Sequence, residues 1–369
     1  MFGGAFKNKT VWLSGHTGFK GAWLAQWLIQ LGARVHGYAL TPPTNPSLFE
    51  QLQLEKKLVH TIADIRDDAR VRQSIKDCKP DFVFHLAAQP LVRESFKTPL
   101  ETYQTNVMGT VHVLEALRGL DHPCTGILVT TDKCYENREW LHGYREVDAL
   151  GGYDPYSSSK AAAEMAIAGY RRSFFANGPV KVASVRAGNV IGGGDWATDR
   201  IVPDCIRALQ KQQLIPVRNK TATRPWQHVL EPLSGYLWLA AVLSKPQLAK
   251  HDLSRIDPAF NFGPTSASNR TVAELTEEVL KHWPGKWEDR SDPKAVHEAN
   301  LLMLSTDKAH ALLRWVPVWN FAETIAATAT WYRQVHEGKS ADLPQKLTSE
   351  QIAQYAKAAA QSAVPWAME

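Results

Sequence analysis

The stretch Thr10-Val-Trp-Leu-Ser14 is short, apolar and rich in β-forming residues, and the segment Gly15-His-Thr-Gly18-Phe-Lys-Gly21 follows it directly. Apolar residues then recur at helical spacing over 19–31, and Arg34-Val-His-Gly-Tyr-Ala39 returns as a second strand. Glycines at this spacing allow a sharp turn and let a pyrophosphate approach the amides at a helix N-terminus. The pattern therefore predicts a Rossmann-type unit with a dinucleotide site, whereas the bland alternative is three glycines that only pack helix against strand.

The alternation of strands and helices continues along the chain. Strands are expected at 81–86, 126–131 and 180–185, with helices at about 100–118 and 157–175 between them. Near-continuous apolar strands separated by helices are typical of a parallel sheet that is covered on both faces. The predicted fold class is therefore α/β, with a Rossmann-type doubly wound parallel sheet.

The amino-acid composition changes after Arg186, where Gly, Pro and Trp become frequent. Later helices are expected to begin at two capping boxes, Thr271-Val-Ala-Glu274 and Thr348-Ser-Glu-Gln351. We therefore expect a smaller C-terminal α/β lobe that binds substrate. The predicted division assigns 1–186 to an NAD-binding Rossmann domain to which 228–262 returns, and assigns 187–227 and 263–369 to a nucleotide-sugar-binding lobe.

Composition excludes several classes of protein. The chain has 369 residues, and its 42 Lys and Arg against 37 Asp and Glu leave a formal charge of +5. This weak, scattered positive charge does not form the basic patch that nucleic-acid-binding proteins carry. No stretch is apolar enough to span a membrane. The four cysteines lack CxxC spacing and are too few for a disulfide scaffold, so we expect reduced thiols, a cytoplasmic protein and no metal site.

Two features of the sequence leave open which cofactor binds and which side chains contact its phosphates. The second strand ends in Tyr38-Ala-Leu-Thr41, without the acidic residue that usually binds the adenosine ribose, which leaves NADP open beside NAD. His16 and Lys20 bring two cationic groups to the start of the helix, where its dipole disfavours them unless a phosphate lies between. They are predicted either to contact cofactor phosphates or to be ordinary solvated side chains.

Candidate catalytic residues lie in two short segments. Tyr156 and Lys160 are four residues apart on one predicted helical face, and an ammonium that lowers the pKa of a phenol lets it take a proton from a substrate hydroxyl. Thr131, Asp132 and Lys133 follow the fifth predicted strand at the edge of the sheet where ligands bind. They predict acid and base chemistry beside the redox pair, and the bland alternative is a capping Asp and a surface Lys.

Together these motifs resemble the extended short-chain dehydrogenase/reductases that act on nucleotide sugars. The resemblance rests on the glycine turn, Asp64, His85-Leu-Ala-Ala-Gln89, Tyr103-Gln-Thr-Asn106 and Tyr156…Lys160, which occur in the family's order. Thr131-Asp132 followed by a polar residue resembles the 4,6-dehydratases rather than the 4-epimerases. Two further segments, Arg186-Ala-Gly-Asn-Val-Ile-Gly-Gly-Gly-Asp-Trp196 and Ala222-Thr-Arg-Pro-Trp-Gln-His228, look most like the CDP-glucose 4,6-dehydratases.

The resemblance implies roles for individual residues. Asp64 would meet the adenine ring, and Asn106 would belong to the proton-relay network behind the lysine. Cofactor contacts are implied for Gly15, His16, Thr17, Gly18, Phe19, Lys20, Gly21, Asp64, Ile65, Leu86, Ala87, Ala88, Asn106, Tyr156 and Lys160. Substrate contacts are implied for Asn189, Trp196, Arg200 and Arg224, of which Arg224 would pair with the pyrophosphate.

The implied reaction is an NAD-dependent 4,6-dehydration, with CDP-glucose as substrate and a hydro-lyase as the enzyme class. Many dTDP-glucose relatives have Glu where this chain has Lys133, and an amine can replace that base only when it is neutral. We expect Lys133 to take the C5 proton and Asp132 to protonate the leaving C6 hydroxyl; the alternatives are the reverse assignment and a Lys133 that only stabilises enolate charge. A nucleotide-sugar 4-epimerase and a non-catalytic NAD-binding scaffold are the alternatives. By resemblance we also expect a homodimer or homotetramer that pairs helices near 101–117 and 157–175, and a product used for surface-polysaccharide deoxysugars such as those of O-antigen.

Overall fold

The computed structural model describes all residues except 250, 252, 254–256, 292–300 and 369. Its centre is a seven-stranded, wholly parallel sheet in the order β3-β2-β1-β4-β5-β6-β11. The strands span Thr10–Ser14 (β1), Arg34–Ala39 (β2), Val59–Ile62 (β3), Phe82–His85 (β4), Cys124–Val129 (β5), Val180–Ala187 (β6) and Ala259–Phe262 (β11). The strand order reverses between β1 and β4, and such a switch point opens a crevice at the carboxyl ends of the strands.

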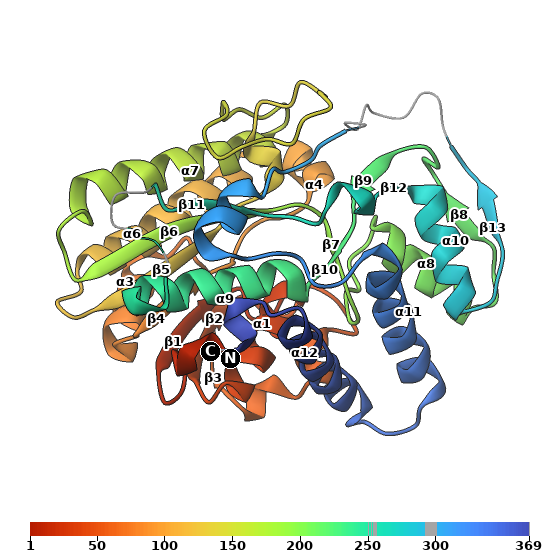
Figure 1. Ribbon diagram of the computed structural model, residues 1–369, viewed down its shortest axis with the longest axis horizontal. Coiled ribbons are helices and arrows are strands. Elements are labelled where there is room, and N and C mark those ends of the chain that lie inside the picture. Colours follow the sequence, from red (N-terminus) through yellow and green to blue (C-terminus); the bar gives the residue numbers. More distant parts are fainter. Residues whose placement is uncertain (250, 252, 254–256, 292–300, 369) are drawn as a thin grey trace.

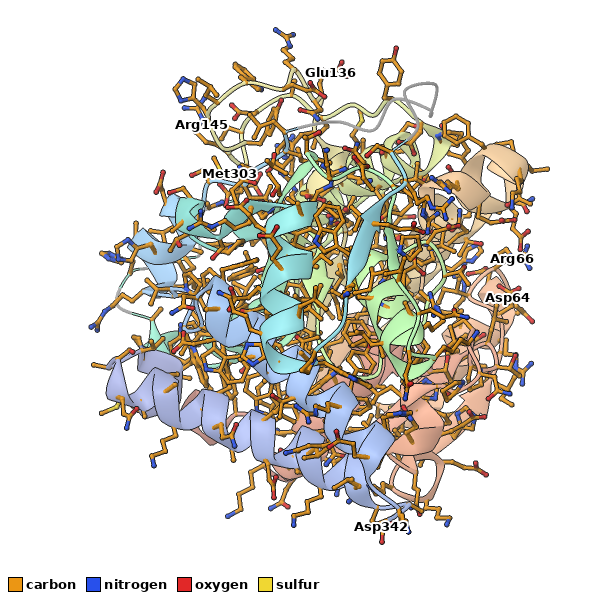
Figure 2. All side chains as sticks on the ribbon, turned by 90° about the vertical axis from the view of Figure 1, so that its right-hand side faces the viewer. Asp64, Arg66, Glu136, Arg145, Met303 and Asp342 are labelled. Carbon is orange, nitrogen blue, oxygen red and sulfur yellow. The ribbon has the colours of Figure 1, made fainter. Side chains whose placement is uncertain are left out.

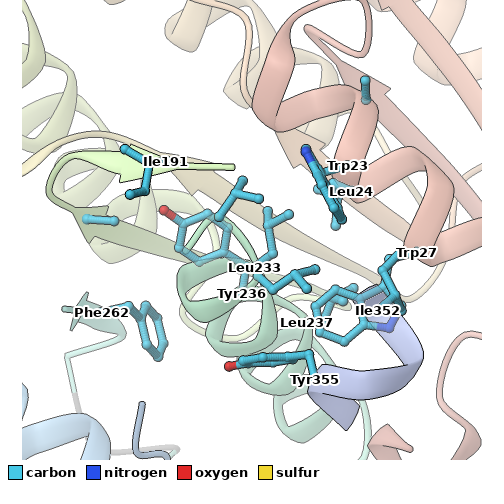
Figure 3. Close-up of a cluster of buried hydrophobic side chains, with 14 of the residues drawn as sticks. Trp23, Leu24, Trp27, Ile191, Leu233, Tyr236, Leu237, Phe262, Ile352 and Tyr355 are labelled. Atoms are coloured by element: carbon cyan, nitrogen blue, oxygen red, sulfur yellow. The ribbon is translucent and has the colours of Figure 1, made fainter. Parts of the chain in front are cut away.

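Helices cover both faces of this sheet (Figure 1). One face carries α3 (Asp68–Cys78), α6 (Gly109–Arg118) and α7 (Pro155–Phe174) over a core that includes Trp12 and Val83. The opposite face carries α1 (Phe19–Gln30), α9 (Leu230–Ser244) and, on α1, α12 (Leu343–Gln361). In Figure 3 the side chains Trp27, Tyr236 and Tyr355 from these three helices pack into one buried cluster.

A smaller lobe lies at the right of Figure 1. Its helices are α8 (Ile201–Gln210), α10 (Val272–His282) and α11 (Phe321–Glu337). Its strand pairs are parallel for β7 (Val190–Ile191) with β10 (Gln227–His228) and for β8 (Ile215–Val217) with β13 (Trp287–Asp289), and antiparallel for β9 (Thr223–Pro225) with β12 (Asn269–Thr271).

Four short helices lie elsewhere in the described part of the chain: α2 (Leu48–Gln51), α4 (Val92–Lys97), α5 (Pro99–Tyr103) and α13 (Pro365–Met368).

The structure confirms the predicted fold class and corrects several boundaries. The predicted helix at 100–118 is interrupted by a π-helical turn at Gln104–Met108, and β5 begins two residues before the predicted position. The capping box Thr271/Glu274 is present, but Thr348 lies inside α12, which begins at Leu343. The threonine hydroxyl instead accepts a hydrogen bond from the Trp331 indole at 3.1 Å.

Two sets of contacts bear on the predicted division of the chain. α9 and β11 lie on the main sheet, where the segment 228–262 was expected to return. However, α12 packs against α1, and the Gln26 amide donates to the Ser349 hydroxyl at 3.1 Å. α12 therefore contacts both α1 and the lobe helix α11, and the predicted boundaries of the two domains stay a prediction.

Candidate active site

The glycine turn joins β1 to α1 as predicted. Gly15 has φ +77°, and a Cβ at this position would lie 2.7 Å from the Ala87 amide nitrogen. A Cβ at Gly21 would lie 2.1 Å from the Gly15 carbonyl oxygen. Ser14 ties the turn to the end of β4, because its hydroxyl accepts from the amides of Leu86 and Ala87 at 3.1 Å each. Only glycine fits at 15 and 21, which leaves a backbone cradle at the N-terminus of α1.

His16 is placed differently from expectation. Its side chain is fully buried, and its Nε2 lies 2.7 Å from Nδ1 of His60. Burial and the neighbouring His60 lower the pKa of His16 to about 3, so the ring is neutral. The prediction of a cationic side chain facing a phosphate is therefore wrong, because the imidazole packs under Gly37 of β2 instead of entering the cleft.

Lys20 lies deeper in the cleft than a solvated side chain would. Burial, together with the charges of Arg200 and Lys160, lowers its pKa to about 8, and Asp132 opposes the shift. Its Nζ is 5.7 Å from the ring centre of Tyr236 on α9. The side chain therefore faces the predicted catalytic residues as well as the glycine turn.

The cleft itself has a volume of about 930 Å³ and runs along the carboxyl ends of β1, β4, β5 and β6. This volume is near the upper end of the range for ligand sites. Its walls include most of the predicted cofactor residues: Gly15, Thr17, Gly18, Phe19, Lys20, Gly21, Asp64, Ile65, Leu86, Ala87, Ala88, Tyr156 and Lys160.

Asp64 lies at the rim of the cleft beside Arg66 (Figure 2). Arg66 Nη2 is 2.6 Å from Asp64 Oδ2, and the Arg66 amide donates to Oδ1 at 2.9 Å. These hydrogen bonds hold the pKa of Asp64 below its ordinary value. The carboxylate is thus anchored in an ionised state where β3 ends.

The predicted redox pair meets the end of β5 inside the cleft. Tyr156 is hydrogen-bonded to Thr131, and the Lys160 ammonium donates to the Val129 carbonyl at 3.3 Å. Burial raises the pKa of Tyr156 to about 12, and the Thr131 contact opposes this only in part. Burial lowers the pKa of Lys160 to about 8, against the charge of Glu164. The expected lowering of the phenol's pKa is therefore absent in the structure, where desolvation outweighs the hydrogen bond to Thr131 and the charge of Arg200.

Asp132 is buried beside this pair. Its Oδ1 accepts from the Thr131 hydroxyl at 3.0 Å, and a Cβ at Gly188 would lie 2.9 Å from its Oδ2. Burial raises its pKa, while the charges of Lys133 and Arg224 oppose the shift. Lys133 is half-buried on the cleft wall, and its amide donates to Thr131 Oγ1 at 3.3 Å. A buried carboxyl group with a raised pKa is suited to proton transfer.

Two residues beneath the site escaped the sequence analysis. Glu164, one turn after Lys160 on α7, is 2.8 Å from Arg186 Nη2 on β6, and both side chains are at most 4% exposed. The Glu164 carboxylate also accepts from the hydroxyls of Thr130 at 2.5 Å and Ser184 at 2.8 Å. The available signal was the spacing of Glu164 from Lys160, four residues further along one helical face. This buried network joins α7 to β5 and β6.

Asn106 lies in the π-helical turn behind Lys160 and is not part of the described cleft wall. Its Nδ2 donates to Ser159 Oγ at 2.9 Å and to the Gln89 carbonyl at 3.1 Å, and its Oδ1 accepts from the Gln89 amide at 2.8 Å. It therefore links the loop after β4 to α7, next to the lysine.

Three of the four predicted substrate residues line the same cleft: Asn189, Arg200 and Arg224. Arg200 Nη1 is 2.8 Å from Asp195 Oδ2, and the guanidinium is an electrostatic neighbour of Tyr156. Trp196 lies outside the described wall of the cleft, because its indole donates to Gln51 Oε1 at 3.1 Å. Its role in the structure is to pack edge-on against Tyr332.

Fold and site together define a Rossmann-type α/β protein in which one long cleft joins a glycine turn to a Tyr–Lys pair. A family model described as GDP-mannose 4,6 dehydratase matches residues 13–328. The chain belongs to this family. It is also 46% identical over 337 residues to a protein named CDP-glucose 4,6-dehydratase from Salmonella typhimurium (strain LT2), covering 89% of this chain and 91% of that relative.

More distant relatives agree with this assignment. A protein named dTDP-glucose 4,6-dehydratase from Xanthomonas campestris pv. campestris is 26% identical, over 87% of this chain and 92% of its own. Among solved structures, dTDP-glucose 4,6-dehydratase from Bacillus anthracis in complex with NAD has a TM-score of 0.71 at 20% identity, covering 88% and 96% of the two chains. UDP-glucose 4-epimerase from Thermotoga maritima, with UDP-glucose, has a TM-score of 0.73 at 19% identity, covering 89% and 99%. These two likenesses support the fold.

Proposed function

We propose that the chain is an NAD-dependent nucleotide-hexose 4,6-dehydratase that converts CDP-glucose to CDP-4-keto-6-deoxyglucose and water. The observation that carries the proposal is that Tyr156, Lys160, Thr131, Asp132 and Lys133 line one cleft with the glycine turn. The similarity to the Salmonella relative supports CDP-glucose as the substrate. A 4-epimerase would need the tyrosine and lysine but no acid for a leaving hydroxyl.

The residues of the turn fit a dinucleotide. Gly15 and Gly21 leave a cradle that a Cβ would fill, and it opens onto the N-terminus of α1, which favours a pyrophosphate. Asp64 and Ile65 would hold the adenosine end. NAD in relatives of this fold supports the choice of cofactor over NADP. The chemistry that bound NAD supplies is reversible hydride storage, taken from sugar C4 and returned at C6.

The protein's own groups move the protons. Tyr156 takes the C4 hydroxyl proton while Thr131 hydrogen-bonds the same oxygen, and a nearby positive nicotinamide would add to Lys160 in stabilising the phenolate. The C4 ketone acidifies the C5 proton. In its neutral amine form Lys133 removes that proton, and Asp132, with its raised pKa, protonates the C6 hydroxyl, which leaves as water. The protonated Lys133 then exchanges with solvent and returns a proton to C5 as the hydride returns at C6. Asn189, Arg200 and Arg224 would hold the diphosphate, consistent with their cationic and amide groups.

The variant Asp132→Asn tests this assignment. It keeps the size of the side chain and its contact with Thr131 but removes the acid, so C4 oxidation should proceed while water loss stops. We expect CDP-glucose to produce stoichiometric absorbance at 340 nm from trapped NADH and less than about 1% of wild-type product. Full product formation by the variant would contradict the role of Asp132, and an epimerised product from the wild type would favour the epimerase.

Exposed apolar side chains support self-association through α5, the π-helical turn and α7. Leu100 is 70% exposed, Met165 67% and Met108 46%. Because apolar side chains on adjoining helical elements are costly to leave in water, we propose a homodimer that pairs these helices, with a tetramer as the larger alternative. Light scattering on Leu100→Lys/Met165→Lys should report a smaller species than the wild type.

In the described residues, no helix is long and apolar enough to cross a membrane.

A further inference from the structure

A cluster of charged side chains lines the cleft where α4 meets the smaller lobe. Arg218 comes directly after β8, and Asp199 directly precedes Arg200 at the start of α8. Arg218 Nη1 is 2.7 Å from Asp199 Oδ1, and Arg93 Nη1 of α4 is 3.5 Å from the same oxygen. Arg218, Asp199 and Arg93 all line the cleft. The proposed mechanism uses none of them.

Residues behind this cluster fix its geometry. Arg218 Nη2 is 2.5 Å from Asp204 Oδ2, and the other oxygen of Asp204 is 2.6 Å from Arg207 Nη2. Arg207 also donates to the carbonyls of Trp196 and Ala197 at 3.2 Å. Asp204 is only 18% exposed, whereas the side chains of Arg218 and Asp199 are 48% and 50% exposed. The structure therefore presents a pre-oriented guanidinium and a carboxylate side by side to a ligand.

The position of this pair matches one part of the proposed substrate. The sugar would lie at Tyr156 and the diphosphate between Arg200 and Arg224, so the nucleotide base would extend past them into the lobe, toward β8 and Arg218. Pro216 of β8 and Val272 also line the cleft and offer apolar surface to a ring. The two ion contacts of Arg218 use two of its five N–H donors, and a carboxylate has about four acceptor positions. Both groups thus keep capacity for hydrogen bonds to a base.

Cytosine differs from uracil and thymine in which ring positions donate hydrogen bonds and which accept them. Cytosine has an amino donor at C4 and acceptors at N3 and O2, whereas uracil and thymine have an acceptor at C4 and an N–H at N3. A guanidinium can only donate, and an ionised carboxylate can only accept. We propose, resting on the proposed function, that Arg218 and Asp199 form the base subsite and select cytosine: Arg218 donates to O2 and N3, and Asp199 accepts from the 4-amino group.

Three variants separate this proposal from a merely structural ion pair. Arg218→Met removes the donors. Asp199→Asn adds an N–H that can pair with the 4-oxo group of uracil, and Asn tolerates the φ of +59° at this position. Lys220→Met is the matched control, because Lys220 lies in the same loop and pairs with Asp289 at 2.8 Å, outside the described cleft wall.

The test is calorimetric titration of each protein with CDP and with UDP, which does not depend on turnover. We expect the wild type to prefer CDP, Arg218→Met to weaken CDP binding by about 10- to 100-fold and UDP binding much less, and Asp199→Asn to reduce the CDP preference by about 10-fold or more. Lys220→Met should leave both affinities unchanged. A gain in UDP binding by Asp199→Asn is an effect that loss of stability does not produce.

Two results would overturn the assignment. An unchanged ratio of CDP to UDP affinity in both variants would mean that Arg218 and Asp199 only connect α4 to the lobe and do not contact the base. An equal loss of both nucleotides in Arg218→Met would assign this arginine to the diphosphate. Failure of the proposed function has a different signature, because a wild type that binds neither nucleotide would reject the nucleotide-sugar substrate itself.

Discussion

The buried pair Glu164–Arg186 is predicted to hold the catalytic helix on the sheet. Arg186 Nη2 and Nε lie 2.8 and 2.9 Å from the two carboxylate oxygens of Glu164, and Arg186 Nη1 donates to the Tyr135 hydroxyl at 2.6 Å. Burial alone would raise the pKa of Glu164, but the hydrogen bonds and charge of Arg186, with the hydroxyls of Thr130 and Ser184, bring it below its ordinary value. The carboxylate is therefore ionised in the folded protein.

The variant Arg186→Met leaves this carboxylate buried without its counter-charge. Removing one partner of a buried ion pair costs about 3–5 kcal/mol. With about 2.1 cal/mol/K of unfolding entropy per residue, a chain of this length should lose roughly 4–6 °C in its thermal midpoint. The assay is calorimetry or circular dichroism at pH 7, with Arg72→Met, whose exposed partner is Asp68, as the control that stays near the wild type.

The pH dependence gives an independent check. Because the folded pKa of Glu164 is depressed, its stabilisation is present above the unfolded pKa of about 4.5 and is lost as pH falls through the lower folded value. The gap between wild type and Arg186→Met should therefore be wide at pH 7 and narrow below about pH 4. An unchanged midpoint at pH 7, or a gap of equal size at both pH values, would refute this reasoning.

Three further changes have defined outcomes. Tyr156→Phe should abolish C4 oxidation, seen as no NADH absorbance with CDP-glucose, whereas the fully exposed Tyr153→Phe should retain wild-type turnover; turnover by Tyr156→Phe would remove the phenol from the mechanism. Gly15→Ala should weaken NAD binding by about 10-fold or more in a fluorescence titration, because a Cβ would lie 2.7 Å from the Ala87 nitrogen; unchanged affinity would place the cofactor elsewhere. Burial raises the pKa of Glu231 to about 7, so its stabilisation is full below about pH 4.5 and is lost as pH rises to 7. Glu231→Gln should therefore show a flatter dependence of thermal midpoint on pH between 5 and 7.5, and curves of equal slope would contradict the shift.

The sheet and the glycine turn could be predicted because their signals are local. Apolar runs define β1, β2 and β4, and the turn needs glycine at 15 and 21 for steric reasons that the spacing itself carries. The start of α12 could not be predicted in this way. A capping-box pattern at Thr348 competes with tertiary packing, and the hydroxyl's bond to Trp331 leaves it inside the helix.

The residues of the candidate site also divide into those that a local sequence pattern predicts and those that depend on tertiary contacts. Tyr156, Lys160 and Thr131 follow from helical spacing and from the end of a strand, so they meet as predicted. The charge state of His16 depends on its burial and on His60, 44 positions away in the chain, and no local pattern predicts either. Arg186 pairs with Glu164 across two elements, and its burial is a property of the packed fold only.

The central claim is that this cleft dehydrates a CDP-hexose. The most direct measurement mixes the protein and NAD with CDP-, UDP-, dTDP- and GDP-hexoses in turn and follows product mass in ordinary and deuterated water. The account predicts that CDP-glucose alone loses one water, gains solvent deuterium and leaves no net NADH. A CDP-glucose sample whose mass is unchanged, with or without a product inverted at C4, would contradict it.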